Sequence, residues 1–140
     1  MVEEVQGGRQ IPERGDRGHR RIQCALAETS ALVELRVEVD GVLVDVVISV
    51  RLLSRVVRTA SGWKLASLDA IYEKDAMAPV YPADRLAISR QDTAPYRRSY
   101  QFLTYSARGH LPADIPGDDR PDLVAALYDE AETWLRSASL

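Results

Sequence analysis

The chain has 140 residues, of which 46% are apolar and 28% are charged, as expected for one globular domain with a single core. Its net charge of −3 argues against a generic nucleic-acid-binding protein, which needs a surplus of Lys and Arg to neutralise phosphates. No apolar run predicts a membrane helix and the amino end lacks the order of a signal peptide, so we expect a cytoplasmic protein without nucleic-acid or membrane partners.

Residues 1–19 are predicted to be a flexible tail, because glycines, a proline and charges lie together there without an apolar period. The single cysteine, Cys24, cannot form an internal disulfide, which fits a reducing compartment. One cysteine and two distant histidines do not provide the ligands of a zinc site. We therefore predict no metal. The sequence also lacks a glycine-rich phosphate loop, so we predict no cofactor.

Residues 20–140 are predicted to form a single domain, whose first part, 20–75, is an antiparallel sheet. Asp40-Gly41 predicts a two-residue hairpin turn, since both central positions of a type I′ turn need a positive φ. If Val39 pairs with Val42, alternate pairs along the hairpin are apolar on one face. We expect that face to be a core face.

The opposite face of the hairpin is mixed, and there Arg36 lies across from Asp45, which predicts a cross-strand ion pair. The second strand extends from residue 42 to about residue 59, or roughly 60 Å at about 3.3 Å per residue, far longer than a usual strand. It must therefore bend or bulge, and we expect a strongly curved sheet.

A second turn at Ser61-Gly62 leads into the stretch LASLDAIYEKD, which carries an acid, Asp69, among apolar residues. A turn of two or four residues places Asp69 on the apolar face beside Ser54 and Ile71, whereas a turn of three places it on the other face. Desolvation on the apolar face would raise its pKa and suit it to act as a general base on a carbon acid. The alternative is a structural Asp, bonded to a serine or an amide or facing water.

After the sheet, residues 76–140 are predicted to form an extended loop and then two helices. The first helix is expected over 95–108, with Asp92 or Thr93 as its cap and Gly109 at its end. Its aromatic stripe is more typical of a core than of a ligand site.

The second helix is expected from Arg120 or Pro121 to about Ser137, with Asp118 or Asp119 as its cap. Apolar residues at helical spacing predict one buried stripe on this helix. The stripe consists of Leu123, Val124, Leu127, Tyr128, Ala131, Trp134 and Leu135.

His19 is a second candidate for chemistry, because an imidazole that titrates near neutral pH can relay protons. It lies in the segment GDRGHRR, at the junction between the tail and the first strand. The alternative interpretation is an exposed histidine without a function.

The two long strands and the Gly62-Trp63-Lys64-Leu65 entry to the third resemble the SnoaL-like branch of the nuclear transport factor 2-like superfamily. The later segment that contains Pro116-Gly117-Asp118-Asp119-Arg120-Pro121 is similar to a carboxy-terminal extension of some bacterial members. Together the two regions cover roughly residues 25–136.

The resemblance implies an α+β cone, in which a curved antiparallel sheet wraps around helices, encloses an apolar pocket and often forms a homodimer. Relatives include polyketide cyclases, dehydratases, steroid isomerases and epoxide hydrolases, and also proteins without a known reaction, so the fold alone does not assign chemistry. The first 20 residues are too few and too rich in glycine to supply the family's amino-terminal helices. We therefore expect a cone shortened at its amino end, whose sheet is covered by the carboxy-terminal helices or by a second protomer.

The resemblance limits the candidate catalytic residues to Asp69 and, less directly, His19. The residues expected to line the pocket are Ser54, Trp63, Ile71 and Tyr100. The first hypothesis is a domain of unassigned activity that binds a small apolar molecule, forms a homodimer, or both. One alternative is a lyase or isomerase of the dehydratase or polyketide cyclase type with Asp69 as general base, and another is a protein-interaction module.

Overall fold

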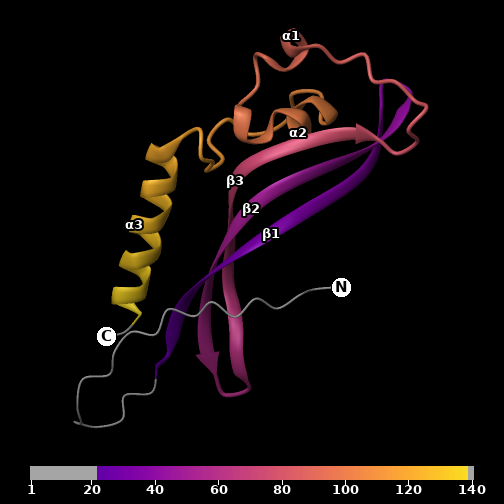
Figure 1. Cartoon of the computed structure of the whole chain (residues 1–140). Coiled ribbons are helices and arrows are strands. Elements are labelled where there is room, and N and C mark those ends of the chain that lie inside the picture. Colours follow the sequence, from indigo (N-terminus) through magenta and orange to yellow (C-terminus); the bar gives the residue numbers. More distant parts are fainter. Residues whose placement is uncertain (1–21, 139–140) are drawn as a thin grey trace, which may run out of the picture.

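The computed structural model describes residues 22–138, so the predicted tail and His19 lie outside the described residues. The fold is α+β, with a three-stranded antiparallel sheet in the order β1-β2-β3 followed by helices (Figure 1). The strands are β1 (Cys24–Val39), β2 (Val42–Thr59) and β3 (Gly62–Pro79). The helices are α1 (Arg90–Thr93), the 3-10 turn η1 (Arg98–Tyr100), α2 (Gln101–Ser106) and α3 (Pro121–Ser137). In residues 22–138 no helix combines the length and the apolar character that crossing a membrane requires.

The β1–β2 hairpin has the predicted register along its whole length. Asp40 and Gly41 form its turn, with φ angles of 50° and 80°, as a type I′ turn requires. Arg36 donates hydrogen bonds of 2.8 and 3.0 Å to the two carboxylate oxygens of Asp45. The predicted cross-strand ion pair is therefore confirmed.

The long sheet is curved, as predicted (Figure 1), but the bulges lie in β3 and not in the second strand, β2. The turn before it has two residues, since Thr59 pairs with Gly62, but Ala66 is an extra residue in β3 and shifts the pairing by one. Asp69 consequently pairs with Leu53 and points to the same face as Leu53. The prediction that turn length alone decides the face of Asp69 is wrong, because the bulge at Ala66 reverses the alternation.

A second bulge places Glu73 as an extra residue between the partners of Ser49 and Val50. β3 then continues to Pro79, beyond the predicted end of the sheet at residue 75, because it still pairs with β2 up to Val44. The connecting loop is shorter than predicted for the same reason.

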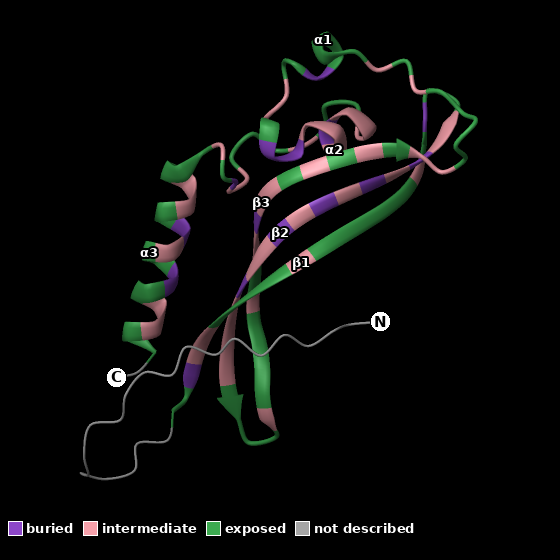
Figure 2. Ribbon diagram, viewed as in Figure 1, coloured by how far each residue is buried: buried purple, intermediate pink, exposed green. Residues whose placement is uncertain are grey.

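The two faces of the sheet are covered at different ends, by different helices. On one face, which we call the α2 face, Val44, Val46, Ile48 and Val50 of β2 are buried. Residues of α2 and of the loop before α1 pack against them. Figure 2 shows the resulting alternation of buried residues along β2, and Figure 1 shows α2 over this end of the sheet.

The other face, which we call the α3 face, carries the odd-numbered residues of β2. Leu53 and Ile71 are buried there against Leu127 and Ala131 of α3. Cys24 is also buried, with its sulfur 3.8 Å from the carbonyl oxygen of Leu135. The apolar stripe predicted for the second helix thus packs on the half of the sheet nearest the β2–β3 turn.

The predicted helix over 95–108 is wrong in its first half. Asp92 closes a capping box with Ser89 at the start of α1, and the chain at Arg97 is extended before the helical turns resume at η1. Arg97 is held in that conformation by distant partners, which override the local helical preference. The end of the helical region is close to the predicted end at residue 108, since α2 ends at Ser106 and Gly109 follows with a φ of 78°.

α3 (Pro121–Ser137) confirms the second helix, with the proline in its first turn. The predicted caps are wrong, because the N-cap residue is Arg120 and no side chain caps the helix. The carboxylates of Asp118 and Asp119 instead bind arginines elsewhere in the chain.

A crossing segment, residues 107–120, carries the chain from the α2 face around the edge of β3 to the α3 face. The amide of Tyr72 donates to the carbonyl of Pro116 at 3.0 Å, and the amide of Asp118 donates to the carbonyl of Tyr72 at 2.9 Å. Between them, a Cβ on Gly117 would lie 3.0 Å from the hydroxyl oxygen of Ser99. Because Gly117 has no Cβ, the crossing segment can approach η1 this closely.

Candidate functional site

The α2 face is uncovered near the β2–β3 turn, because α3 packs on the opposite side of the sheet there. Leu65, Leu68 and Trp63 of β3 lie in this region, with 59%, 51% and 47% of their surface exposed. Their partners on β2 and β1 share the same face, since directly opposed residues of an antiparallel ladder point the same way. We call this set the open face; it consists of Ala25, Ala27, Ser54, Val56, Arg58, Trp63, Leu65 and Leu68.

The apolar surface continues from the open face along the edge strand β1. Val33 and Leu35 point to the α2 face, opposite Ile48 and Val46, yet both are exposed. α2 packs mainly against β2 and β3. The core face predicted for the hairpin is thus buried along β2, whereas on β1 Val39 is buried beside the turn and Val33 and Leu35 are exposed. Figure 2 shows this contrast between mostly exposed β1 and the buried positions of β2.

The uncovered part of the α3 face has a different character. It carries Glu34, Arg36 and Glu38 of β1, together with Asp45 of β2 and Lys74 of β3. These charged side chains suit a surface that stays in water. One leucine, Leu32, is exposed among them, and single apolar residues on a surface are ordinary. An apolar surface is therefore specific to the α2 side of the sheet.

The residues predicted to form a pocket do not lie together. Ser54 and Trp63 belong to the open face, whereas Asp69 and Ile71 point to the α3 face. Ile71 is fully buried beneath α3. Tyr100 is buried at η1, over the other part of the α2 face. The bulge at Ala66 is the cause, because it separates the side chains of β3 that a regular strand would place on one face.

Asp75 has the environment that the sequence suggested for Asp69. It pairs with Ile48 on the α2 face, and its Oδ2 accepts a 2.8 Å hydrogen bond from the amide of Leu103 in the first turn of α2. Its Oδ1 is buried without a hydrogen-bond partner among the residues of the described part. Burial raises the pKa of this carboxyl group above its ordinary value.

Sequence reasoning missed Asp75 because Glu73-Lys74-Asp75 resembles the polar end of a strand. The signal that could have indicated it is the apolar alternation that resumes at Met77, which matches a strand that continues past Asp75.

Replacing Asp75 with asparagine should stabilise the fold at pH 7 by up to about 1 kcal/mol, since the uncharged amide still accepts from Leu103 and avoids burying a charge. Because the pKa of Asp75 is raised in the folded state, the protonated carboxyl group favours folding, and this contribution is fully present below the ordinary pKa of about 3.8. The contribution is lost as the pH rises through the folded-state pKa. The difference between variant and wild type should therefore shrink toward pH 4. Urea unfolding at both pH values measures it, with exposed Asp114→Asn as the control. An equal effect at both pH values contradicts the assignment.

Arg97 is the main anchor of the crossing segment. Its Nη2 and Nε donate to the two oxygens of Asp119 at 2.6 and 3.0 Å. Its Nη1 donates to the carbonyls of Ala113 and Ile115 and to the hydroxyl of Tyr100. The guanidinium lowers the pKa of Asp119 and is itself mostly buried, so this cluster has a structural role.

Arg51 forms a second anchor on the α3 face. It donates to Glu73 at 2.8 Å and to Asp118 at 3.0 Å, and Glu28 lies 3.7 Å from its Nε. The hydroxyl of Tyr128 on α3 donates to Glu28. This cluster joins all three strands to the crossing segment and to α3. Across residues 22–138, no group of three or more His, Cys, Asp or Glu side chains is placed to hold a metal ion.

Comparison with known proteins finds a similarity that extends over most of the chain. No protein-family model matches the chain. The chain is 29% identical over 126 residues to a PEP2-like protein of Fusarium vanettenii, an alignment that covers 83% of this chain and 54% of that protein. The chain therefore spans about half the length of the curated relative it matches, and the similarity includes most of the fold described above.

Proposed function

We propose that this chain is a SnoaL-like domain that binds through its open face, pairing with a second copy of itself and holding a small apolar molecule between the two sheets. The observation that carries the proposal is the open face itself, on which Trp63, Leu65 and Leu68 are about half exposed. Large contiguous apolar patches are uncommon on monomeric proteins and mark interaction sites. The resemblance of the strands and of the crossing segment to SnoaL-like proteins supports the same proposal.

A second copy is the occupant that the rest of the chain favours. α2 and α3 already pack elsewhere on the sheet, and residues 1–21 consist mostly of charged residues and glycine, which offer little apolar surface. The open face is apolar at its centre and has Arg58 at one end, where its guanidinium lies 5.9 Å from the ring centre of Trp63. Two such faces can pack on each other about a two-fold axis, with like side chains in contact at the centre.

The shape of the open face favours a small ligand between the protomers. Ala25, Ala27 and Ser54 are small, and they lie beside the bulky Leu65 and Leu68 of β3. Two such uneven surfaces leave space above the small residues when they pack. The open face contains no carboxylate, so the ligand class is apolar and uncharged, with the Ser54 hydroxyl as a polar contact. Binding, rather than general-base catalysis, is the activity that this composition supports.

Sedimentation of the purified chain tests the pairing. Wild type should sediment as a dimer at micromolar concentration, and Leu65→Glu should weaken the dimer at least tenfold, because it places a charge in the apolar contact. Leu32→Glu is the matched control, since Leu32 is a similarly exposed leucine on the α3 face and its replacement should leave the dimer intact. A monomeric wild type, or equal dissociation by both variants, contradicts the proposal.

The ligand site is tested separately, with Nile red as an apolar probe. Its emission should increase in the presence of the wild-type dimer and fall in Ser54→Leu, which fills the space without adding charge. If the Ser54→Leu variant still forms a dimer and Nile red emission is the same as with wild type, the ligand part of the proposal is contradicted. The pairing would remain supported.

A further inference from the structure

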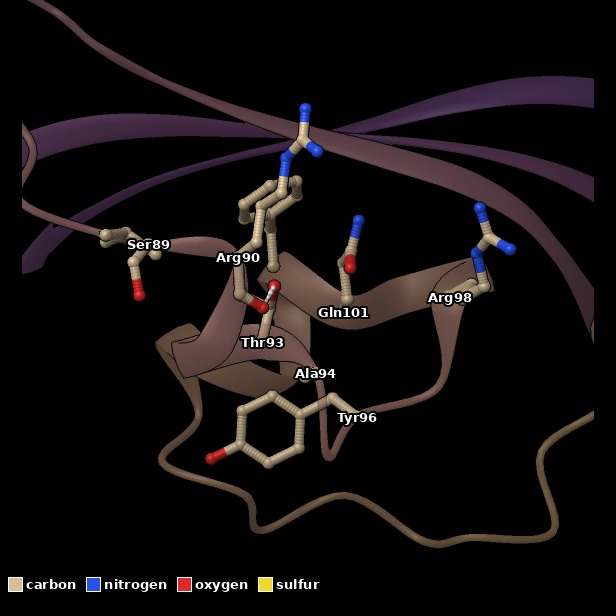
Figure 3. A pocket seen from close by; sticks show the side chains of 9 residues that line it. Ser89, Arg90, Thr93, Ala94, Tyr96, Arg98 and Gln101 are labelled. Carbon is tan, nitrogen blue, oxygen red and sulfur yellow. Dashed lines mark hydrogen bonds between the residues drawn. The ribbon is translucent and has the colours of Figure 1, made fainter.

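A groove of about 570 Å³ lies on the short helices that cover the α2 face, away from the open face. α1, η1 and α2 all contribute to its lining. Its volume is within the range of about 300–1,000 Å³ that is usual for small-molecule sites. Figure 3 shows the side chains that surround it.

The groove is positively charged. Arg90 begins α1 and Arg98 begins η1, and in Figure 3 both guanidinium groups and the Gln101 amide point to the same side. The lining contains no acid, although the chain as a whole has a net charge of −3. The nearest acid along the chain, Asp92, is occupied by the amide and hydroxyl of Ser89, at 2.7 and 3.0 Å.

Arg90 and Arg98 stand apart from the structural arginines. Arg51 and Arg97 are enclosed by carboxylates, whereas none of the ion pairs within residues 22–138 includes Arg90 or Arg98. A planar guanidinium presents paired donors that match a carboxylate in two parallel hydrogen bonds. The two groups can therefore receive an external anion without breaking an internal contact.

The apolar part of the groove comes from Ile88 and Phe102. Both pack on their inner side against the buried valines and Ile48 of the α2 face, so they form a supported surface beside the arginines. Supported apolar side chains with a few convergent polar groups are the usual composition of a small-molecule site.

We propose that this groove binds a small carboxylate, whose anionic group is held by Arg90 and Arg98 and whose flat apolar body lies on Ile88 and Phe102. Gln101 contributes a further donor on the same side. The groove and the open face use different residues, so this inference is independent of the proposed pairing.

Calorimetric titration of the full chain with 2-naphthoate tests the site. We expect saturable binding that weakens as salt increases, and at least fivefold weaker binding in Arg90→Gln and in Arg98→Gln. Arg85→Gln, an exposed arginine outside the lining, is the matched control and should bind as wild type does. Circular dichroism of each variant verifies that the fold is retained. Leu65→Glu should also bind normally, which separates this site from the open face.

Two further probes identify which part of the ligand is recognised. Neutral 2-naphthamide should bind at least tenfold more weakly than 2-naphthoate, and inorganic phosphate should also bind at least tenfold more weakly. Equal binding of the amide overturns the role of the arginines, and equal binding of phosphate overturns the role of the apolar surface. Absence of saturable 2-naphthoate binding, or an equal loss in Arg85→Gln, overturns the site as a whole.

Discussion

Replacing Arg97 with methionine is expected to lower the free energy of unfolding by about 3 kcal/mol, because it leaves the partner of a mostly buried ion pair uncompensated. Arg97 and Asp119 expose only 17% and 19% of their side chains. Methionine retains much of the volume of the arginine but donates nothing to Asp119 or to the carbonyls of the crossing segment. Since those contacts fix how the chain passes from one face of the sheet to the other, the docking of α3 should weaken as well.

Chemical denaturation at pH 7 measures this loss, and Arg120→Met provides the matched control. Arg120 also binds an aspartate, Asp122, through two hydrogen bonds, but both partners are largely exposed. The loss in the control should therefore be much smaller than the loss in Arg97→Met. Adding Asp119→Leu to Arg97→Met should recover part of the stability, because it removes the uncompensated carboxylate. Similar small losses in both arginine variants contradict an anchoring role for Arg97.

The same pair gives the wild-type chain a dependence on pH. Arg97 lowers the pKa of Asp119 in the folded state, so the pair stabilises the fold above the ordinary carboxyl pKa and the stabilisation is lost as the pH falls through the lowered value. Asp75 acts in the opposite sense, because burial raises its pKa.

The hairpin and α3 could be predicted because local patterns determine them. Asp40-Gly41 specifies its own turn, and the apolar alternation on both sides then allows a single register. The stripe on α3 (Pro121–Ser137) has a regular helical period, and Pro121 marks its start. In both elements the local preference and the tertiary contacts agree.

The bulge at Ala66 could not be predicted, because nothing near Ala66 in the sequence distinguishes a bulged strand from a regular one. Its effect is to bring Ile71 to the face on which Leu127 and Ala131 of α3 lie. The stabilisation comes from residues far along the chain, so a local pattern does not contain it. The positions of Asp69 and Asp75 follow from the two bulges and were unpredictable for the same reason.

In the crossing segment, contacts with distant residues override the local preference of an aspartate to cap a helix. Asp118 and Asp119 precede Pro121 at positions where an aspartate commonly caps a helix. Each instead pairs with an arginine, Arg51 or Arg97, across a long stretch of sequence. In each pair both the donor and the acceptor carry a charge and the arginine binds in two places, which favours these contacts. The helix therefore begins without a side-chain cap.

Replacing Ile71 with alanine is expected to lower the free energy of unfolding by about 3 kcal/mol, within the 2–5 kcal/mol typical of a buried Ile-to-Ala change. Ile71 is completely buried, in the cluster with Leu53, Leu127 and Ala131. The cavity would lie between β3 and α3, so hydrogen exchange of the α3 amides should also become faster. Leu68→Ala is the matched control, because Leu68 lies three residues earlier on the open face and is about half exposed.

The two substitutions should give opposite patterns when unfolding and self-association are measured on the same samples. Ile71→Ala should reduce stability and leave the affinity of the proposed dimer nearly unchanged, whereas Leu68→Ala should weaken the proposed dimer and change monomer stability by less than about 1 kcal/mol. If β3 had a regular register instead of the bulge at Ala66, Ile71 would share a face with Leu65. Its replacement would then weaken association and leave α3 protected from exchange. That result would contradict the arrangement in which one bulge separates the open face from the face that holds α3.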